Sequence, residues 1–400
     1  MSAVARAAIE TGPLTCQSSH FHLERSAHYL NCAYGAPLLH DVERAGRAAL
    51  RRWRRPWAMG PETYFDDAER ARLLFGRLIG ARDGERIAIV PGVAYGIALA
   101  ARNVAVRRGA NIVIAAEQFP SNVHAWRRVS DAAGAELRVA ARPAAGSGSW
   151  SERLMDAIDA RTAVVALGTI DWIDGTMFDL EAIGDRARAV GAAYVLDGIQ
   201  SLGALPFDVE RVRPDLLVCA AYKWLLGPMG IGLCYVGERF AQGEPLEETW
   251  LGRRGSDDFT TLTNYADAYQ PGARRFDASG RAHFILMPML VAALRQLLAW
   301  GPAWVQDYCT RLIRPALSEL ATLGYFPSAG DPHAMHLFSV GVPPGQSVDA
   351  VRSLLERRRV HVSMRAGRIR ISPHLYNAPE DLDALVSALG AATTRATAPA

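Results

Sequence analysis

The sequence predicts an α/β protein with two parts: a large domain built on a mainly parallel sheet covered by helices on both faces, and a smaller C-terminal α/β domain. Three observations support this fold class. Between Arg86 and Cys219 short apolar runs alternate with helical patterns, as expected of strands joined by crossover helices. The runs are apolar at almost every position, which is typical of strands buried on both faces. Beyond about residue 290 the pattern changes to shorter strand and helix signals, which indicates a second domain.

The N-terminal part is expected to contain a lead-in, a short strand or loop, and a helix. Residues 1–22 are read as a loose polar lead-in. Residues 28–37 are apolar and end with Gly35 and Pro37, so a helix is expected from about Leu39.

That helix carries a basic run, composed of Arg44, Arg47, Arg51, Arg52, Arg54 and Arg55. Such a run can meet a phosphate backbone, or it can be a solvated or subunit-facing surface. Neither an alternating aromatic platform nor a helix-turn-helix pattern accompanies it. We therefore expect no nucleic-acid partner.

Seven apolar runs are the predicted strands of the large domain, which is expected to span residues 23–285. They are Ile87–Val90, Ile112–Ala115, Leu137–Ala140, Ala163–Leu167, Ala193–Leu196, Leu216–Cys219 and Gly232–Tyr235. Helical patterns lie between most of them, as in the segment with Leu180, Ile183 and Ala187 on one face. In such sheets ligands bind at the carboxyl ends of the strands. The residues that follow these runs are therefore candidates for a site.

The smaller domain is expected over residues 286–392, and the N-terminal segment of the large domain is expected to pack on it. Its predicted elements are the strands Leu337–Val340, Val360–Val362 and Arg368–Ile371 and the helices Val348–Arg358 and Pro379–Leu389. Residues 393–400 are expected to form a flexible tail. Ala144–Ser149 is read as a loop, because the strand–helix pattern resumes after it.

Composition excludes several classes of protein. The net charge of +3 over 400 residues gives no general reason to expect a nucleic-acid or membrane partner. Five cysteines are scattered and odd in number, without a CxxC spacing, so we expect neither a disulfide framework nor a metal site. The longest apolar run, Phe284–Leu294, is broken by Pro288 and is too short to span a bilayer. A cytoplasmic, reducing location fits best.

Lys223 is the only lysine, so 43 of the 44 basic residues are arginines. Arginine does not lose its proton in proteins and cannot act as an amine nucleophile, whereas lysine can. Codon bias alone could also have left a single lysine. The two interpretations are separated by the residues around it.

Asp197 follows the apolar run Ala193–Leu196 and lies 26 residues before Lys223. An aspartate at a strand end and a lysine on a later strand-end loop are what pyridoxal phosphate requires. The amine forms the Schiff base, and the carboxylate keeps the pyridine nitrogen protonated so that the ring can accept electrons. A capping carboxylate is the alternative for Asp197 taken alone.

The motifs Val195-Leu196-Asp197-Gly198-Ile199-Gln200-Ser201-Leu202-Gly203, Pro214-Asp215 and Tyr222–Gly232 resemble those of the class V aminotransferase family of fold-type-I pyridoxal-phosphate enzymes. The resemblance runs from about Tyr29 to Leu389. In the residues of its motifs the chain is most similar to isopenicillin-N epimerase-like and kynureninase-like members. The resemblance to this family implies a sheet of the seven-stranded type in the large domain.

The resemblance also implies roles for residues near the lysine. Asp197 would bind the pyridine nitrogen, Gln200 the 3-hydroxyl group of the ring, and Lys223 would form the aldimine. Tyr222 would reach the cofactor phosphate. These are expectations for a pyridoxal 5'-phosphate site.

Other cofactor contacts are expected at the ends of three strands. The turn at Val93 and Ala94 opens a helix whose free N–H groups attract an anion, so the phosphate is expected there. An ordinary strand-to-helix turn is the alternative. By resemblance, Phe119 stacks on the cofactor ring, and Asp171 and Trp172 contact the cofactor or the substrate.

The remaining expected site residues lie in the outer parts of the chain. Arg370 matches the arginine that grips the substrate α-carboxylate, a task suited to a planar fork. The loop Arg275–Gly280 resembles one that reaches the neighbouring subunit's cofactor phosphate, here with Ser279 and Gly280, which implies a homodimer with active sites at the subunit interface. By resemblance only, three further residues line the substrate pocket: Asn31, Ala33 and Tyr34.

The resemblance implies an enzyme that acts on the α-carbon of an amino acid through a Lys223 aldimine and a quinonoid. A lyase for β-elimination or C–S cleavage and an epimerase are the first expectations. An amino-acid:2-oxo-acid aminotransferase and, from another class, a non-catalytic binding or regulatory protein that has kept the fold are the alternatives. A typical cysteine desulfurase is not expected, because residues 362–367 lack the nucleophilic cysteine of that loop.

Overall fold

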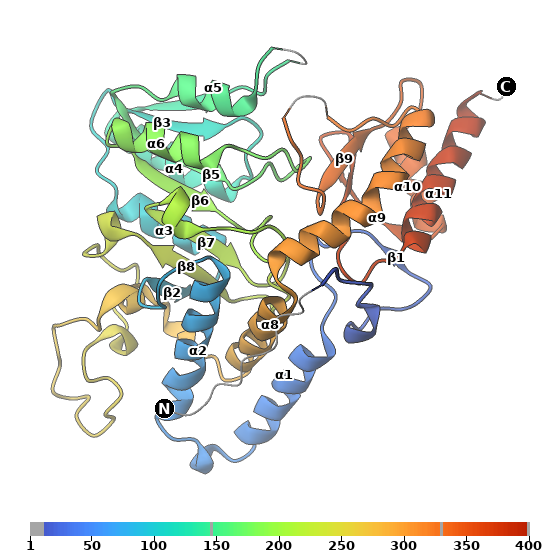
Figure 1. The fold of residues 1–400 in the computed structure, drawn as a ribbon. Helices are drawn as coiled ribbons and strands as arrows, with labels where there is room; N and C mark the ends of the chain where they lie inside the picture. Colours follow the sequence, from blue (N-terminus) through green and yellow to red (C-terminus); the bar gives the residue numbers. More distant parts are fainter. Residues whose placement is uncertain (1–11, 145–146, 329–330, 398–400) are drawn as a thin grey trace.

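The computed structural model describes residues 12–144, 147–328 and 331–397, and its centre is a seven-stranded sheet (Figure 1). The strands are β2 (Ile87–Val90), β3 (Asn111–Ala115), β4 (Glu136–Ala140), β5 (Thr162–Gly168), β6 (Ala193–Asp197), β7 (Leu216–Ala220) and β8 (Gly232–Val236). Their order is β2-β8-β7-β6-β5-β3-β4. Strand β8 runs antiparallel to both of its neighbours, and the other pairs are parallel. All seven predicted strands are confirmed to within one residue at each end, and so is the fold class.

Apart from the edge strand β4, both faces of this sheet are largely buried, which explains why most of its strands are apolar at nearly every position. In β2 the side chains of Ile87 and Ile89 join one hydrophobic core, whereas those of Ala88 and Val90 join another. Successive side chains of a strand point to opposite faces, so each strand has to supply both cores. The first core extends into the C-terminal part of the chain.

Helices cover the two faces unequally. The second core is closed by α3 (Val93–Asn103) and α4 (Ser121–Ala133). The first is closed by α2 (Glu62–Leu78), α5 (Trp150–Ala157), α6 (Leu180–Ala189) and α8 (Leu286–Trp300). Helix α1 (His40–Trp53) lies along α8, and the short α7 (Val209–Val212) precedes β7.

A smaller antiparallel sheet lies at the C-terminal end, with the order β11-β12-β9. Its strands are β9 (Phe338–Gly341), β11 (Ser363–Arg365) and β12 (Arg368–Ile371), and the helices beside it are α9 (Pro302–Thr322), α10 (Val348–Arg357) and α11 (Pro379–Thr397) (Figure 1). The N-terminal strand β1 (His28–Tyr29) pairs with β10 (Val360–His361). Residues 28 and 29 therefore lie against the C-terminal part.

The two chain ends differ from what the sequence suggested. Residues 1–11 lie outside the described residues, but Leu14 and Phe21 of the expected loose lead-in are buried, and Phe21 stacks on Trp300 at 5.9 Å. At the other end α11 continues through the expected tail to Thr397, where alanines favour the helical conformation and no glycine or proline interrupts it. Residues 398–400, and residues 145 and 146 of the expected loop Ala144–Ser149, lie outside the described residues.

Pro288 does not break the apolar run in which it lies. It occupies the first turn of α8, where its missing N–H is not needed for a helical hydrogen bond. Among the described residues no single helix is long and apolar enough to cross a membrane. Helices α8 and α9 pass that test only as a pair bent by 68°.

Candidate active site

A cavity of about 500 Å³ lies at the carboxyl ends of the parallel strands. Its lining comes from residues that follow β2, β3, β5, β6 and β7 and from the start of α3. Eight of the predicted site residues line it: Val93, Ala94, Phe119, Trp172, Asp197, Gln200, Tyr222 and Lys223. Segments far apart in the sequence are thus brought together at the edge of the sheet where ligands bind in such folds.

Lys223 lies on a tight loop between β7 and β8. The N–H of Ala221 donates to the carbonyl oxygen of Ile231 and the N–H of Gly227 donates to that of Ala221, both over 2.9 Å. Leu226 adopts the left-handed region at φ 55°, which costs a residue with a Cβ roughly 1–2 kcal/mol. The loop is therefore held in one conformation, and Lys223 is 7% exposed within it.

Lys223 and Asp197 face the same cavity and alter each other's protonation. Burial lowers the pKa of Lys223 to about 8, although the charge of Asp197 opposes this shift. Burial raises the pKa of Asp197 to about 6, and the hydrogen bond from the N–H of Ile199 and the charge of Lys223 oppose it. A lysine whose pKa lies this low has a substantial neutral fraction near neutral pH, which an amine nucleophile requires.

Gln200 is held by hydrogen bonds at both ends of its amide. Its Nε2 donates to the carbonyl oxygen of Ala33 over 3.3 Å, and its Oε1 accepts from the indole Nε1 of Trp224 over 3.0 Å. Ala33 thus contributes to the site through its backbone.

Gly203 allows the strand-end turn of Asp197 and the lysine loop to meet. Its φ is 102°, and a Cβ at this position would lie 2.2 Å from the carbonyl oxygen of Trp224. Any other residue would push the two segments apart.

The start of α3 presents backbone donors to the cavity. The helix has no side-chain cap at its N-cap residue Gly92, and Val93 and Ala94 line the cavity. Gly96 brings the helix close to the sheet, since a Cβ there would lie 2.6 Å from the side chain of Val218. An uncapped helix start attracts anions through its free N–H groups and its dipole.

Aromatic rings form one wall beside the lysine. Phe119 and Trp172 meet edge to face with their centroids 5.3 Å apart. The Nζ of Lys223 lies 6.0 Å from the centroid of Phe119 and 5.7 Å from that of Tyr222. The indole Nε1 of Trp172 donates to the carbonyl oxygen of Glu117 over 2.8 Å, which fixes the wall.

Asp171 is turned away from the cavity, contrary to expectation. Its Oδ1 accepts from the N–H groups of Ile173 and Asp174 over 2.9 and 3.0 Å, and it pairs with Arg142 at 3.3 Å. Burial and the neighbouring charge of Asp174 raise the pKa of Asp171 to about 7. The side chain holds a turn, and among the described residues Asp171 is outside the cavity lining.

Arg370 lies next to the cavity wall. Its Nη1 donates to the carbonyl oxygen of Trp172 over 3.0 Å and its Nη2 to the Oγ of Ser363 over 3.4 Å. Ser363 in turn donates to the Oδ1 of Asn31 over 2.7 Å. The Nε of Arg370 is buried and has no hydrogen-bond partner within the described part of the chain. A second cavity, of about 480 Å³, is lined by Ser363 and by Asn31 and Tyr34, so the latter two, which were expected to line the substrate pocket, lie apart from the first cavity.

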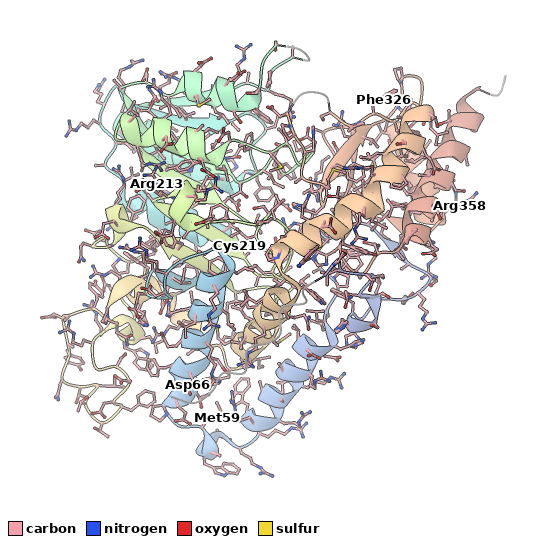
Figure 2. The ribbon with its side chains drawn as sticks, viewed as in Figure 1. Met59, Asp66, Arg213, Cys219, Phe326 and Arg358 are labelled. Atoms are coloured by element: carbon pink, nitrogen blue, oxygen red, sulfur yellow. The ribbon has the colours of Figure 1, made fainter. Side chains whose placement is uncertain are left out.

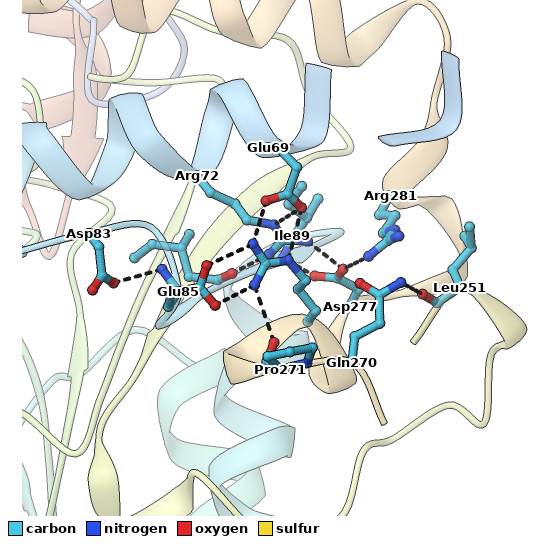
Figure 3. Close-up of polar contacts among 12 residues, drawn as sticks. Glu69, Arg72, Asp83, Glu85, Ile89, Leu251, Gln270, Pro271, Asp277 and Arg281 are labelled. Carbon is cyan, nitrogen blue, oxygen red and sulfur yellow. Dashed lines mark hydrogen bonds and ion pairs between the residues drawn. The ribbon is translucent and has the colours of Figure 1, made fainter. Parts of the chain in front are cut away.

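Ser279 and Gly280 are exposed and lie outside the cavity lining of the described chain. The N–H of Ser279 donates to the Oε2 of Glu247 over 2.7 Å. The segment before them is fixed by Asp277, which pairs with Arg72 and Arg281 and accepts from the N–H of Ile89 over 2.8 Å (Figure 3).

Several cavity residues were not predicted from the sequence. They are Gln118, Ser121, Gly168, Ile170, Ile199, Ala220, Met229 and Gly230, whereas Pro91, Gly92 and Tyr95 belong to the turn at which the phosphate was expected. Their signal was position alone, since nearly all follow a predicted strand within a few residues. Gln118 illustrates why chemistry did not reveal them: its amide binds Ala166 and Gly168 and fastens two strand ends.

The residues present fit pyridoxal 5'-phosphate. The cavity offers an amine with a lowered pKa, a buried carboxylate, aromatic rings and an uncapped helix start. The buried and unpartnered Nε of Arg370 beside it is a donor left for an anionic ligand. In the described residues no group of three or more His, Cys, Asp or Glu side chains is placed to hold a metal ion.

Comparison with known proteins gives a consistent family. The sequence model described as aminotransferase class-V matches residues 61–385. An uncharacterised aminotransferase, YcbU of Bacillus subtilis, is 27% identical over 335 residues, which cover 82% of this chain and 84% of that protein. A cysteine desulfurase of Enterobacter sp. is 30% identical over 342 residues, which cover 80% of this chain and 81% of that protein.

Solved structures show the same fold. The apo cysteine desulfurase of Thermococcus onnurineus NA1 has a TM-score of 0.80 at 19% identity, with 96% of this chain and 99% of that chain covered. The cystine C–S lyase C-DES, in complex with its reaction product cysteine persulfide, has a TM-score of 0.82 at 19% identity, with 92% of this chain and 98% of that chain covered.

Proposed function

The chain belongs to the class-V aminotransferase family, and we propose that within this family it is a lyase that releases a β-substituent, such as a thiol, from an α-amino acid. It is an enzyme of fold type I, and its cofactor is pyridoxal 5'-phosphate. The observation that carries the proposal is the pairing of Lys223, the only lysine, with Asp197 across one cavity.

Each residue of the site has a proposed task in holding the cofactor. Lys223 would bind it covalently and Asp197 would bind its ring nitrogen. Gln200 would hold its 3-hydroxyl group, Phe119 would support its ring, and the start of α3 would bind its phosphate. When bound, pyridoxal 5'-phosphate draws electrons away from the α-carbon of the attached amino acid.

The chain's own residues then bind the substrate and move the proton. Arg370 grips the α-carboxylate and so orients the α-carbon towards Lys223. Lys223 would be released from its covalent bond when the substrate's amino group takes its place, and its neutral amine would then remove the α-proton as a general base. The bond to the β-substituent breaks and its electron pair leaves with that group, which Lys223 can reprotonate. Water completes the reaction, and the products are a 2-oxo acid, ammonia and the released group.

A lyase is favoured over an epimerase because the cavity offers one amine base. Epimerisation needs a proton delivered to the opposite face of the α-carbon. Among the described cavity residues the other titratable groups are Asp197, which is assigned to the ring nitrogen, and the tyrosines Tyr95 and Tyr222, whose pKa values are raised, mainly by burial. An aminotransferase is the second candidate, because YcbU bears that description.

A cysteine desulfurase that works through its own thiolate is disfavoured by the cysteines. Cys32, Cys219, Cys234 and Cys309 are buried, and none of the five cysteines lines the described cavity. Cys219 lies inside the large sheet on β7 (Figure 2). Burial raises the pKa of Cys32 to about 12, and a thiol this weakly acidic supplies little thiolate for attack.

We test the lyase proposal with purified holoenzyme and a panel of L-cysteine, L-cystine, cysteine S-conjugates and L-serine. Formation of a 2-oxo acid and ammonia without any added 2-oxo acid is expected. Turnover that requires a 2-oxo acid acceptor would show an aminotransferase, and loss of optical activity without either product would show an epimerase. A colourless protein that gains no absorbance with pyridoxal 5'-phosphate would overturn the assignment altogether.

A homodimer and a cytoplasmic location are part of the proposal. The exposed Ser279 and Gly280 are free to contact a neighbouring subunit's cofactor phosphate. Light scattering of the purified chain should give a mass of about twice 43.4 kDa, and Ser279→Arg should weaken cofactor binding without unfolding the chain. A monomeric holoenzyme of full activity would refute the shared site.

A further inference from the structure

Two arginine side chains of the hairpin formed by β11 and β12 lie against one indole ring. The Cζ atom of Arg365 is 5.9 Å from the ring of Trp172, and that of Arg370 is 5.8 Å from the same ring. Trp172 lines the active-site cavity. Two cations therefore meet at one wall of this cavity, within the range of cation–π attraction.

The two guanidinium groups differ in their partners. Arg370 is buried and is held by Trp172 and Ser363. Arg365 is half-buried, and its Nη1 donates to the carbonyl oxygen of Met364 over 2.7 Å. Arg365 forms no ion pair with any acidic side chain that the structure describes, so its charge lacks a counter-ion of its own.

The charge of Arg365 reaches the reactive lysine. Burial is the main cause of the lowered pKa of Lys223, and the positive charges of Arg370 and Arg365 add to it. Burial and then Arg365 also lower the pKa of Arg370 to about 10. Like charges held together raise the free energy of a site. A ligand with two negative groups relieves this repulsion better than a ligand with one.

Space beyond the indole suits a longer substrate. Arg365 lines the second cavity, of about 480 Å³, together with Asn31, Tyr34 and Ser363. Arg365 thus lies against Trp172, which lines the first cavity, and itself lines the second cavity. A substituent that leaves the α-carbon in the direction of Trp172 would meet its guanidinium group.

We propose that Arg365 is a specificity-determining residue that binds a second carboxylate of the substrate while Arg370 binds the α-carboxylate. The substrate class is then an α-amino acid with a further carboxylate. That group lies either at the end of its side chain or on a second, disulfide-linked amino acid. A guanidinium fork is suited to this task because it binds two carboxylate oxygens at once. This inference rests on the proposed function, since it needs an amino acid bound at Lys223.

Binding to the holoenzyme tests it. Absorbance titrations with L-aspartate, L-glutamate and L-cystine are compared with titrations with L-alanine and L-2-aminobutyrate, which lack the second carboxylate. The first group is expected to bind more tightly. Arg365→Gln is expected to raise Kd about 10- to 100-fold for the first group and to leave the second group unchanged. If Arg365→Gln loses affinity only for aspartate and glutamate, the second carboxylate lies at the end of the substrate's side chain. If it loses affinity only for cystine, that carboxylate lies on the second amino acid.

Two further variants guard against a trivial loss of structure. Arg365→Lys keeps the charge and should restore part of the affinity for the first group. Arg358→Gln removes an exposed arginine at the outer edge of the C-terminal part (Figure 2) and should change neither group. Equal weakening of both groups in Arg365→Gln, or no preference for the first group in the wild type, would overturn the inference and leave the proposed function standing. Absence of any spectral change with every amino acid would instead refute the proposed function.

Discussion

The indole Nε1 of Trp224 donates a hydrogen bond to the Oε1 of Gln200 over 3.0 Å, and both side chains are buried beside Lys223. Trp224 follows the lysine in sequence, whereas Gln200 follows the strand that ends at Asp197. One hydrogen bond thus ties the lysine loop to the turn after the aspartate. The edge of His336 meets the Trp224 ring at 4.4 Å and closes the arrangement from the C-terminal part.

Removing this hydrogen bond should weaken the site and the fold together. In Trp224→Phe the buried Oε1 of Gln200 loses its donor, which costs about 1–3 kcal/mol of unfolding free energy. Gln200 is also released to move, so the affinity for pyridoxal 5'-phosphate should fall. The control is Trp150→Phe, because Trp150 is equally buried and its indole donates to the carbonyl oxygen of Ala140, and neither residue lines the described cavity. Urea unfolding should show similar losses for both variants, and cofactor titration should show a loss for Trp224→Phe alone.

The pKa of Lys223 predicts how the apoenzyme reacts with its cofactor. Only the neutral amine attacks the aldehyde, and burial lowers the pKa to about 8. The rate of absorbance change on adding pyridoxal 5'-phosphate should therefore rise with pH and level off above about pH 8. Borohydride reduction should label one tryptic peptide, and Lys223→Ala should abolish the label. A rate that keeps rising to pH 10 would show an ordinary exposed lysine.

Asp197→Asn should leave the cofactor bound but inactivate the enzyme. The amide cannot hold a proton on the ring nitrogen, so the ring accepts electrons less well, and kcat should fall roughly 10²- to 10³-fold. The amide oxygen can still accept the hydrogen bond from Ile199, which the carboxylate accepts over 3.0 Å. The melting temperature should therefore change little. Unaltered turnover in this variant would mean that Asp197 is a capping residue only.

The sequence predicted the large sheet well for a physical reason. Its strands other than the edge strand β4 are largely buried on both faces, so they appear as nearly unbroken apolar runs, as Ile87–Val90 does. Strand β11 was missed because Ser363, Met364 and Arg365 form no such run and have no alternation that marks a half-buried strand. Short strands in a small sheet depend on their partners more than on their own sequence.

Sequence position also predicted which residues lie near the cavity. It predicted less well the direction in which their side chains point. Asp197 ends β6 and lines the cavity, as its place predicted. Asp171 follows β5 in a similar way, yet its carboxylate is occupied by the N–H groups of its own turn. The direction of a side chain after a strand depends on the local turn and on distant partners such as Arg142. Neither is visible in the residue order.

Asp171 should make the fold less stable as the pH rises through the weakly acidic range. Its pKa is raised to about 7, mainly by burial. Between about pH 4 and pH 7 the folded chain therefore keeps a proton that the unfolded chain releases, and folding stability falls across this interval. Thermal unfolding of Asp171→Asn should not show this decrease. The stability of the variant relative to the wild type should therefore increase from pH 4.5 to pH 7.5.

The control for this prediction is Asp174→Asn. Hydrogen bonds and Arg142 outweigh burial there and lower the pKa of Asp174, so its carboxylate stabilises the fold throughout the same interval. This variant should be less stable than the wild type at every pH tested. A parallel pH dependence in Asp171→Asn and the wild type would contradict the assignment.

Arg370→Lys should weaken binding of every amino acid substrate. The lysine keeps the charge but loses the fork that binds two carboxylate oxygens, and it cannot keep both bonds to Trp172 and Ser363. Charge-assisted hydrogen bonds contribute about 1.5–3 kcal/mol each, so Kd should rise about 10- to 100-fold. Arg368→Lys is the matched control on the same strand, because its guanidinium donates to the Oγ and carbonyl oxygen of Ser339 over 2.7 and 3.1 Å. That variant should lose some thermal stability and keep its amino acid affinity. If both variants weaken binding equally, the effect comes from the strand and Arg370 has no direct part in holding the α-carboxylate.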